Sequence, residues 1–260
     1  MLDKKTTFRF ITIARIFFLR YIKNMDIFLP RLKQTAVLFF FFLILIIPVN
    51  SFSADNLQWS ITGNILCFPA DNGVDADPFP ILPSFGGALS LKLTGPLRLE
   101  FTEDIYFTNY EYNSKLGYPM ACNPENRSAL VIGFITGIQF TGNFALGDKG
   151  TALRVYAGPA ADLRVVALAV GLNHPADFTG KIETDPQLQT DAIRDYFWSG
   201  ARWFMPVAGL GMDFPINEKF LLGFDLRAWF PVYKTWTNEN LPEIEGWRFG
   251  AGIRITPRGN

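Results

Sequence analysis

The residue types that most often perform nucleophilic chemistry are scarce in this chain. His174 is the only histidine among the 260 residues, and it stands in the run GLNHPADF with no serine one or two positions away. A serine hydrolase needs a histidine to accept the proton of its nucleophile, and the chain holds no G-x-S-x-G motif. We therefore expect no enzymatic activity and interpret His174 as a loop residue.

Residues that bind metals or cofactors are equally poorly represented. Asp71, Asp75 and Asp77 fall in the run ADNGVDADPF, but their spacing does not fit an EF-hand, so a solvated acidic loop is the better interpretation. The sequence has no CxxC pair, no His/Cys metal cluster and no glycine-rich phosphate loop at a helix start. We expect no metal and no cofactor.

Charged residues spaced two apart within apolar runs are the most informative chemical pattern. Arg98 and Glu100, for example, alternate with Leu97, Leu99 and Phe101. In a strand, alternate residues point to opposite faces, so this pattern predicts one apolar and one charged face. The predicted charged face holds Lys92, Arg98, Glu100, Arg154, Asp162, Arg164, Asp213, Asp225, Arg227, Arg248 and Arg254.

The elements that carry this pattern are eight predicted strands. Period-two alternation dominates beyond residue 54, and Gly, Pro, Asn and Asp bound the apolar runs. The predicted strands are 57–67, 89–94, 97–102, 129–140, 151–165, 203–214, 220–230 and 246–256.

The connections between these strands alternate in length. Four long connections, the third of them nearly 40 residues, are separated by short ones of about two, ten and five residues. An up-and-down barrel that crosses a membrane has short turns on one side and long loops on the other, whereas a soluble sandwich has no reason for this order. We therefore predict an all-β, eight-stranded antiparallel up-and-down transmembrane barrel formed by residues 54–260.

The whole predicted mature chain resembles the small eight-stranded outer-membrane barrels of the OmpA, OmpX and OmpW kind. This resemblance rests on a predicted cleavable signal peptide within residues 1–53, described below, together with the eight alternating strands, the ordered loop lengths and the closing strand GWRFGAGIRI. It implies an integral outer-membrane protein in contact with lipid and with the barrel-assembly machinery. The long loops are then the surface for an extracellular ligand or a host surface.

The interior of such a barrel is about wide enough for side chains only. Ionised groups there must be paired or hydrated, so we expect contacts between arginines and carboxylates to fill most of the lumen. A structural or surface-contact barrel is the preferred prediction. The alternative is a small porin that passes small solutes or hydrophobic compounds, and a soluble lipocalin-type carrier is the least favoured.

Aromatic residues near the predicted strand ends suggest two interfacial girdles. The alternative is that they are ordinary sheet or core aromatics. The residues assigned to the girdles are Trp59, Tyr106, Trp203, Phe230, Tyr233 and Trp247.

Two further features fall on the predicted long-loop side. Cys67 and Cys122 lie on the same side, where oxidation is permitted, so we predict a disulfide, with two free thiols as the alternative. Residues 185–198 predict a short helix with Asp185 as N-cap and Pro186 at its first position. We expect this helix to cover the loop's own apolar residues, although a lid or a partner contact is also open.

The N-terminal 53 residues are a targeting segment. An uncharged apolar run at 36–48 follows Arg31 and Lys33 and precedes small residues, which is typical of a cleavable secretory signal, and Met25 is a candidate true start. The segment holds eight basic and two acidic residues, which leaves 16 basic and 22 acidic residues in the remainder. An acidic body without a dense basic stripe does not favour nucleic-acid binding, and the predicted location is the bacterial outer membrane.

Overall fold

A computed structural model describes residues 56–69, 81–113, 117–122, 129–147, 149–168, 182, 185–239 and 246–258. The predicted leader, residues 1–53, lies outside the described residues, as do His174 and the acidic run 71–77. No helix in the described part of the chain is long and apolar enough to cross a membrane.

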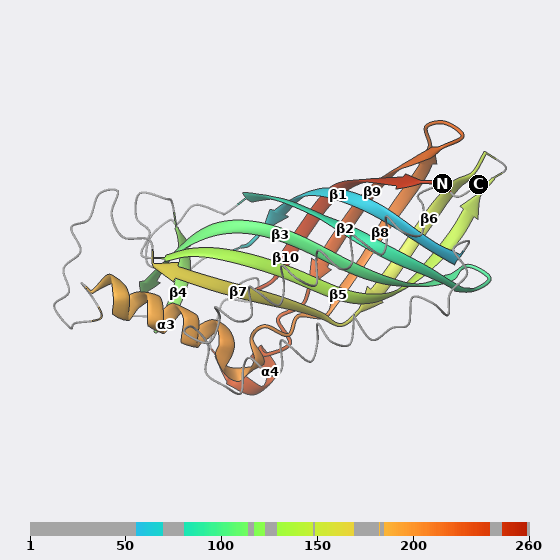
Figure 1. The fold of residues 1–260 in the computed structure, drawn as a ribbon. Helices are drawn as coiled ribbons and strands as arrows, with labels where there is room; N and C mark the ends of the chain where they lie inside the picture. The colour runs from blue at the N-terminus through green and yellow to red at the C-terminus, as the bar shows by residue number, and fades with distance from the viewer. Residues whose placement is uncertain are drawn as a thin grey trace, which may run out of the picture. The chain divides into compact units, whose positions relative to one another are not determined.

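The sheet closes on itself as an antiparallel meander of eight strands, which confirms the predicted all-β, up-and-down barrel (Figure 1). Each strand pairs with its predecessor, and β1 pairs with the last strand, with Ile61 opposite Ile255. The barrel strands are β1 (Leu57–Cys67), β2 (Ile81–Thr94), β3 (Leu97–Asn113), β5 (Ala129–Leu146), β6 (Thr151–Gly158) continued by β7 (Ala160–Leu168), β8 (Val207–Pro215), β9 (Phe220–Trp229) and β10 (Arg248–Pro257).

Several strand bounds differ from the sequence prediction. β2 begins at Ile81 rather than 89, because its first half, ILPSFGGA, contains a proline and two glycines that hide the alternation. β6 and β7 are one predicted strand that Pro159 interrupts, since proline cannot donate to the ladder. β8 begins at Val207, directly after Pro206.

The two ends of the barrel are built differently. Tight connections at 95–96, 147–150 and 216–219 join β2 to β3, β5 to β6 and β8 to β9, and the antiparallel order puts them at one end, here called the turn end. At the other, the helix end, β3 continues to Asn113 and pairs with β4 (Tyr118–Cys122), a strand that the sequence did not predict. The helix end also carries α3 (Pro186–Trp198), the 3-10 turn η4 (Ser199–Ala201) and α4 (Lys234–Thr237).

The barrel is apolar outside and polar inside. In β1, Trp59, Ile61 and Ile65 are each more than half exposed, whereas Ser60, Thr62 and Asn64 between them are buried. The other strands repeat this order with exposed outward side chains that include Phe85, Leu89, Phe107, Phe140, Val155, Leu210, Phe224, Leu226, Ile253 and Ile255.

On the inner wall, the ring of one tyrosine occupies the space that a glycine leaves by having no side chain. The ring of Tyr106 lies over Gly133 on the neighbouring strand, where an added Cβ would stand 2.0 Å from the ring. Its hydroxyl donates to Asp162 Oδ1 at 2.8 Å. Tyr106 thereby joins three strands from inside the barrel.

We expect Gly133→Ala to destabilise the barrel by about 1–3 kcal/mol, because overpacking displaces the ring and weakens its bond to Asp162. Gly63→Ala is the matched control, since its added Cβ would meet only the side chain of Ile253, at 4.0 Å. Urea unfolding in detergent or lipid measures both variants. Equal losses of stability in the two would contradict this packing.

Candidate functional site

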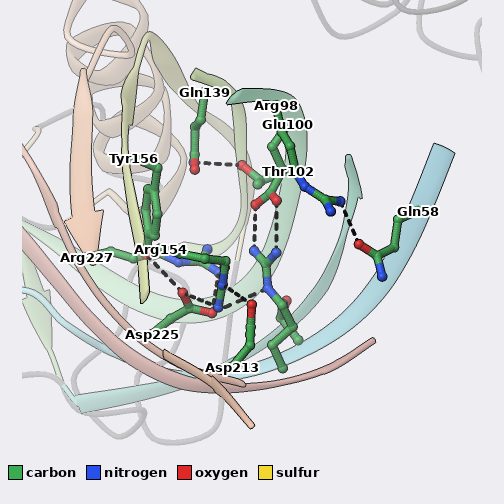
Figure 2. Close-up of polar contacts among 12 residues, drawn as sticks. Gln58, Arg98, Glu100, Thr102, Gln139, Arg154, Tyr156, Asp213, Asp225 and Arg227 are labelled. Carbon is green, nitrogen blue, oxygen red and sulfur yellow. Dashed lines mark hydrogen bonds and ion pairs between the residues drawn. The ribbon is translucent and has the colours of Figure 1, made fainter. Parts of the chain in front are cut away.

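Five charged residues form one ionic cluster in the lumen near the turn end. Arg254 binds Glu100 with two bonds, Nη1 to Oε2 at 2.9 Å and Nη2 to Oε1 at 2.6 Å. Arg154 places Nε 2.8 Å from Asp213 and Nη2 2.9 Å from Asp225. Arg254 Nε lies 3.4 Å from Asp225, so that one carboxylate links both arginines. Figure 2 shows Arg154 beside Asp213 and Asp225 in this cluster.

A second layer continues this cluster along the lumen. Arg227 Nη1 binds Asp104 Oδ2 at 2.6 Å, and its Nη2 lies 3.9 Å from Asp225. Asn64 donates to the other oxygen of Asp104 at 2.7 Å, while the hydroxyl of Tyr156 donates to Asp225 at 3.3 Å. The charges are therefore compensated in a continuous chain rather than in isolated pairs.

Glycines on the inner wall provide the space for these long side chains. An added Cβ at Gly211 would lie 2.5 Å from Asp225 Oδ1, and one at Gly223 would lie 2.5 Å from Asp213 Oδ1. At Gly252 it would stand 1.8 Å from the amide oxygen of Asn64. The charged and glycine positions of β8, β9 and β10 thus fit together across the strands.

A third group of charges lies at the helix end. Asp162 accepts bonds from Arg164 Nε at 2.8 Å and from Arg248 Nε at 3.3 Å, in addition to the one from Tyr106. The guanidinium of Arg248 also stacks on Phe68, 4.1 Å from the ring centroid. This group extends the charged network of the lumen to the helix end.

The helix α3 covers the inner face of the extended strands at this end. Asp185 caps it by accepting bonds from the backbone N–H groups of Gln187 and Leu188. Arg164 stacks on Phe197 at 4.0 Å, and Trp198 Nε1 donates to the Arg164 carbonyl at 3.1 Å. The buried side chains of α3 pack on inward residues of β3, β4 and β5, namely Tyr110, Ala121, Ala129 and Val131.

The position of α3 corrects the preferred sequence interpretation. The helix does not merely cover its own loop; it lies beside β4 and β7 and packs on the barrel wall (Figure 1). The reason is that β3, β5 and β7 extend beyond the other strands and leave an inner apolar surface that no other strand of the described residues covers. The packing is that expected of a helix that covers part of the barrel.

Two contacts tie α3 to the connection between β9 and β10. Arg202 binds Glu239 through both Nε and Nη2, and its guanidinium stacks on the Tyr196 ring at 4.3 Å. The Tyr196 hydroxyl donates to Glu239 at 3.1 Å. Burial, together with Tyr233 and Glu239, raises the pKa of Tyr196, so the phenol keeps the proton that it donates.

The structure brings most of the predicted charged residues into the lumen. Lys92 is an exception: it is exposed at the turn end of β2, where the register shifts beside Thr94. Arg98 is half-buried at the same end and donates to Gln58 at 2.7 Å. Asp104 belongs to the network but was missed, because the predicted third strand stopped at 102; the alternation continues through it.

The predicted aromatic girdle needs two corrections. Tyr106 is fully buried in the lumen, because it shares the face of Glu100 and Asp104. Tyr233 is also buried, at the N-cap of α4. Trp59 is exposed on the outer face, Trp203 is half-buried after η4, and Phe230 packs edge-on against Trp247 with centroids 4.9 Å apart.

The two cysteines lie on separate strands. Cys67 ends β1 and Cys122 ends β4, both at the helix end, and their sulfurs are not bonded to each other in this structure. The disulfide stays a prediction for the exported, oxidised chain. Within the described ranges, no group of three or more His, Cys, Asp and Glu residues is arranged to hold a metal ion.

One carboxyl group interrupts the apolar part of the outer surface of β3, and the sequence analysis missed it. From Leu97 to Phe107 the outward row of β3 reads Leu97, Leu99, Phe101, Glu103, Ile105 and Phe107, and beyond Phe107 it continues with Asn109 and Glu111 into the extension that pairs with β4. Thr136 on β5, directly opposite Glu103, donates its hydroxyl to Oε2 at 2.5 Å. Among the described residues of the other barrel strands, no Asp, Glu, Lys or Arg occupies an outward position. The sequence does contain a signal for this site, because Glu103 is a charged residue at an apolar position of the period-two alternation of β3.

The fold is similar to those of solved β-barrels. The N-terminal β-barrel domain of Pseudomonas aeruginosa OprF has 12% identity and a TM-score of 0.34, with 76% of this chain and 96% of that chain covered. Neisserial surface protein A has 11% identity and a TM-score of 0.42, with coverage of 76% and 96%. Ail of Yersinia pestis, solved with the heparin analogue sucrose octasulfate, has 8% identity and a TM-score of 0.41, with coverage of 78% and 96%.

No protein-family model matches the chain, and no curated protein matches it. At identities this low, no residue role is carried over from the solved barrels to this chain.

We expect Arg154→Ala to destabilise the barrel by about 3–5 kcal/mol, because it leaves Asp213 and Asp225 buried without this partner. The matched control is Arg194→Ala on α3, whose ion pair with Asp191 is partly exposed and worth about 0–1 kcal/mol. Thermal unfolding followed by circular dichroism compares the two. A loss for Arg154→Ala no larger than for the control would contradict a structural role for the cluster.

Proposed function

We propose that this chain is an integral outer-membrane β-barrel that acts as a structural or surface-contact protein and does not conduct solutes. The observation that carries the proposal is the combination of an apolar outer wall with a lumen closed by paired charges. Its location follows from the predicted signal peptide together with that outer wall. Its partners are outer-membrane lipid, the barrel-assembly machinery, and an extracellular ligand or host surface contacted by the long loops.

The outer wall supports insertion in a bilayer. Exposed Leu, Ile, Phe, Val and Trp side chains continue around all eight strands, which is far more contiguous apolar surface than a soluble monomer shows. Closure by the β1–β10 pair leaves no unpaired edge strand in hydrocarbon. A soluble carrier with a greasy interior has the opposite arrangement, so the lipocalin-type alternative is not supported.

The burial of the lumen side chains supports a closed barrel. Arg154, Glu100 and Gln139 are each 2% exposed, and Thr141 is 0% exposed, although all four face the inside. A water-filled channel would leave such side chains accessible to solvent. The lid formed by α3 adds a second barrier at the helix end.

A narrow pore is the second candidate, and one observation favours it. A cavity of about 230 Å³ opens among Ser60, Ser90, Arg98, Asn143 and Thr256 at the turn end. Such a cavity is the entrance that a solute path needs. It is bounded, however, by Glu100, Arg154 and Arg254 of the ionic cluster.

Solute flux into liposomes separates the two functions. We expect the exported chain to float with the liposomes and to give no flux of small sugars or amino acids above that of empty vesicles. Flux with insertion would favour the pore, and failure to float as a folded protein would contradict the membrane proposal itself.

The lid provides a further test. We expect Phe197→Ala to speed protease cleavage within α3 roughly tenfold, because the variant loses stacking on Arg164 and Tyr110 worth about 1–2 kcal/mol. Flux should remain at the background level, because the ionic cluster still fills the lumen. Leu188→Ala, at a more exposed position of the same helix, is the control. A large gain in flux for Phe197→Ala would show that α3 is the gate of a pore.

A further inference from the structure

A lone carboxyl group in the centre of the lipid-facing band needs an explanation, because ionisable residues in membrane-spanning segments normally face a protein interior or a water-filled cavity. Glu103 lies six residues from Leu97 and four from Phe107 on β3. At about 3.3 Å per residue, these distances are about 20 Å and about 13 Å along the strand. The group is therefore too central to reach the headgroup region at either end of the outward row.

The carboxyl is only partly satisfied within the barrel. Oε2 accepts the bond from Thr136, and among the described residues no other side chain bonds this carboxyl group. Acyl chains offer no hydrogen bond. A partner inside the membrane is the remaining source of one.

The surroundings of Glu103 allow such a partner to approach closely. Its two cross-strand neighbours are Gly87 on β2 and Thr136 on β5, and Thr136 is in turn opposite Ala161 on β7. Large apolar side chains, Phe101 and Ile105, flank the group along β3. Small residues around a polar group are the features that favour association between membrane-spanning segments.

We propose that two copies of this barrel associate in the membrane through the face formed by β2, β3 and β5, with Glu103 of one copy opposite Glu103 of the other. A carboxyl group both donates and accepts, so it is complementary to itself across a two-fold axis, as an isologous dimer requires. A proton on one carboxyl is donated to an oxygen of the other, while each Thr136 hydroxyl holds its own glutamate in place. The proposal rests on the proposed membrane insertion.

Subunit counting by single-molecule fluorescence in phosphatidylcholine vesicles tests the proposal over a range of protein-to-lipid ratios. We expect the exported wild-type chain to form dimers and Glu103→Leu to lower the association constant roughly tenfold or more. Glu103→Gln should retain most of the association, because a primary amide is also self-complementary. Leu226→Ala on β9, across the barrel, is the matched control and should associate as the wild type does.

Flotation and heat resistance of the same samples distinguish misfolding from loss of association. Glu103→Leu removes a polar group from the apolar band, so it should float and resist heat in detergent at least as well as the wild type. If the wild-type chain does not float, the proposed function fails. If it floats but is monomeric at every ratio, or if Glu103→Leu still dimerises, the dimer proposal is overturned.

Cross-linking locates the interface independently. In a background with Cys67→Ser and Cys122→Ser, we expect Phe101→Cys to give an oxidised dimer in vesicles and Phe224→Cys on β9 to give none. Equal cross-linking at both positions overturns the proposal. Capture of a different membrane protein by Phe101→Cys, without the homodimer, overturns it as well and assigns the face to that partner.

Discussion

The rest of the structure depends on the neutralisation of charge inside the barrel. Among the described lumen residues, five buried arginines, Arg154, Arg164, Arg227, Arg248 and Arg254, meet five buried carboxylates, Glu100, Asp104, Asp162, Asp213 and Asp225. An unpaired ion in this setting would be costly, so each group has to find a partner from another strand or a near neighbour. The closed sheet makes this possible, because it turns every charged face toward the same axis.

The inner wall brings these charges together by combining long charged side chains with glycines. Long charged side chains reach across the lumen, and glycines opposite them leave the room that the guanidinium and carboxylate groups occupy. Tyr106 over Gly133 repeats the arrangement with an aromatic ring. Around the ionic cluster the lumen is consequently filled by side chains, which supports the proposal of a structural barrel over that of a channel.

The outer wall and the helix end each depart from the arrangement of apolar residues outside and polar residues inside. Between Leu97 and Phe107 on β3, Glu103 is the one charged residue in the apolar outward row, and Thr136 is its hydrogen-bond donor. At the helix end, α3 packs on the inner face of the extended part of β3, β5 and β7, which no strand in the described part of the chain faces. The Arg202–Glu239 pair then joins this lid to the connection between β9 and β10.

The sequence by itself determined the strands, the two faces of each strand and the charged character of the lumen, because period-two alternation is a local property of an extended chain. It missed the first half of β2, where a proline and two glycines interrupt the pattern, and it stopped β3 too early to find Asp104. Only the tertiary structure decided which charges pair. The stagger of the closed barrel brings Arg254 to Glu100, 154 residues away, and Arg227 to Asp104, 123 residues away. It also placed α3 on the wall, since this depends on how far each strand extends beyond its neighbours, which no local pattern encodes. Tyr106, in contrast, turns inward by the same alternation as Glu100 and Asp104, in the part of β3 beyond the predicted end at residue 102.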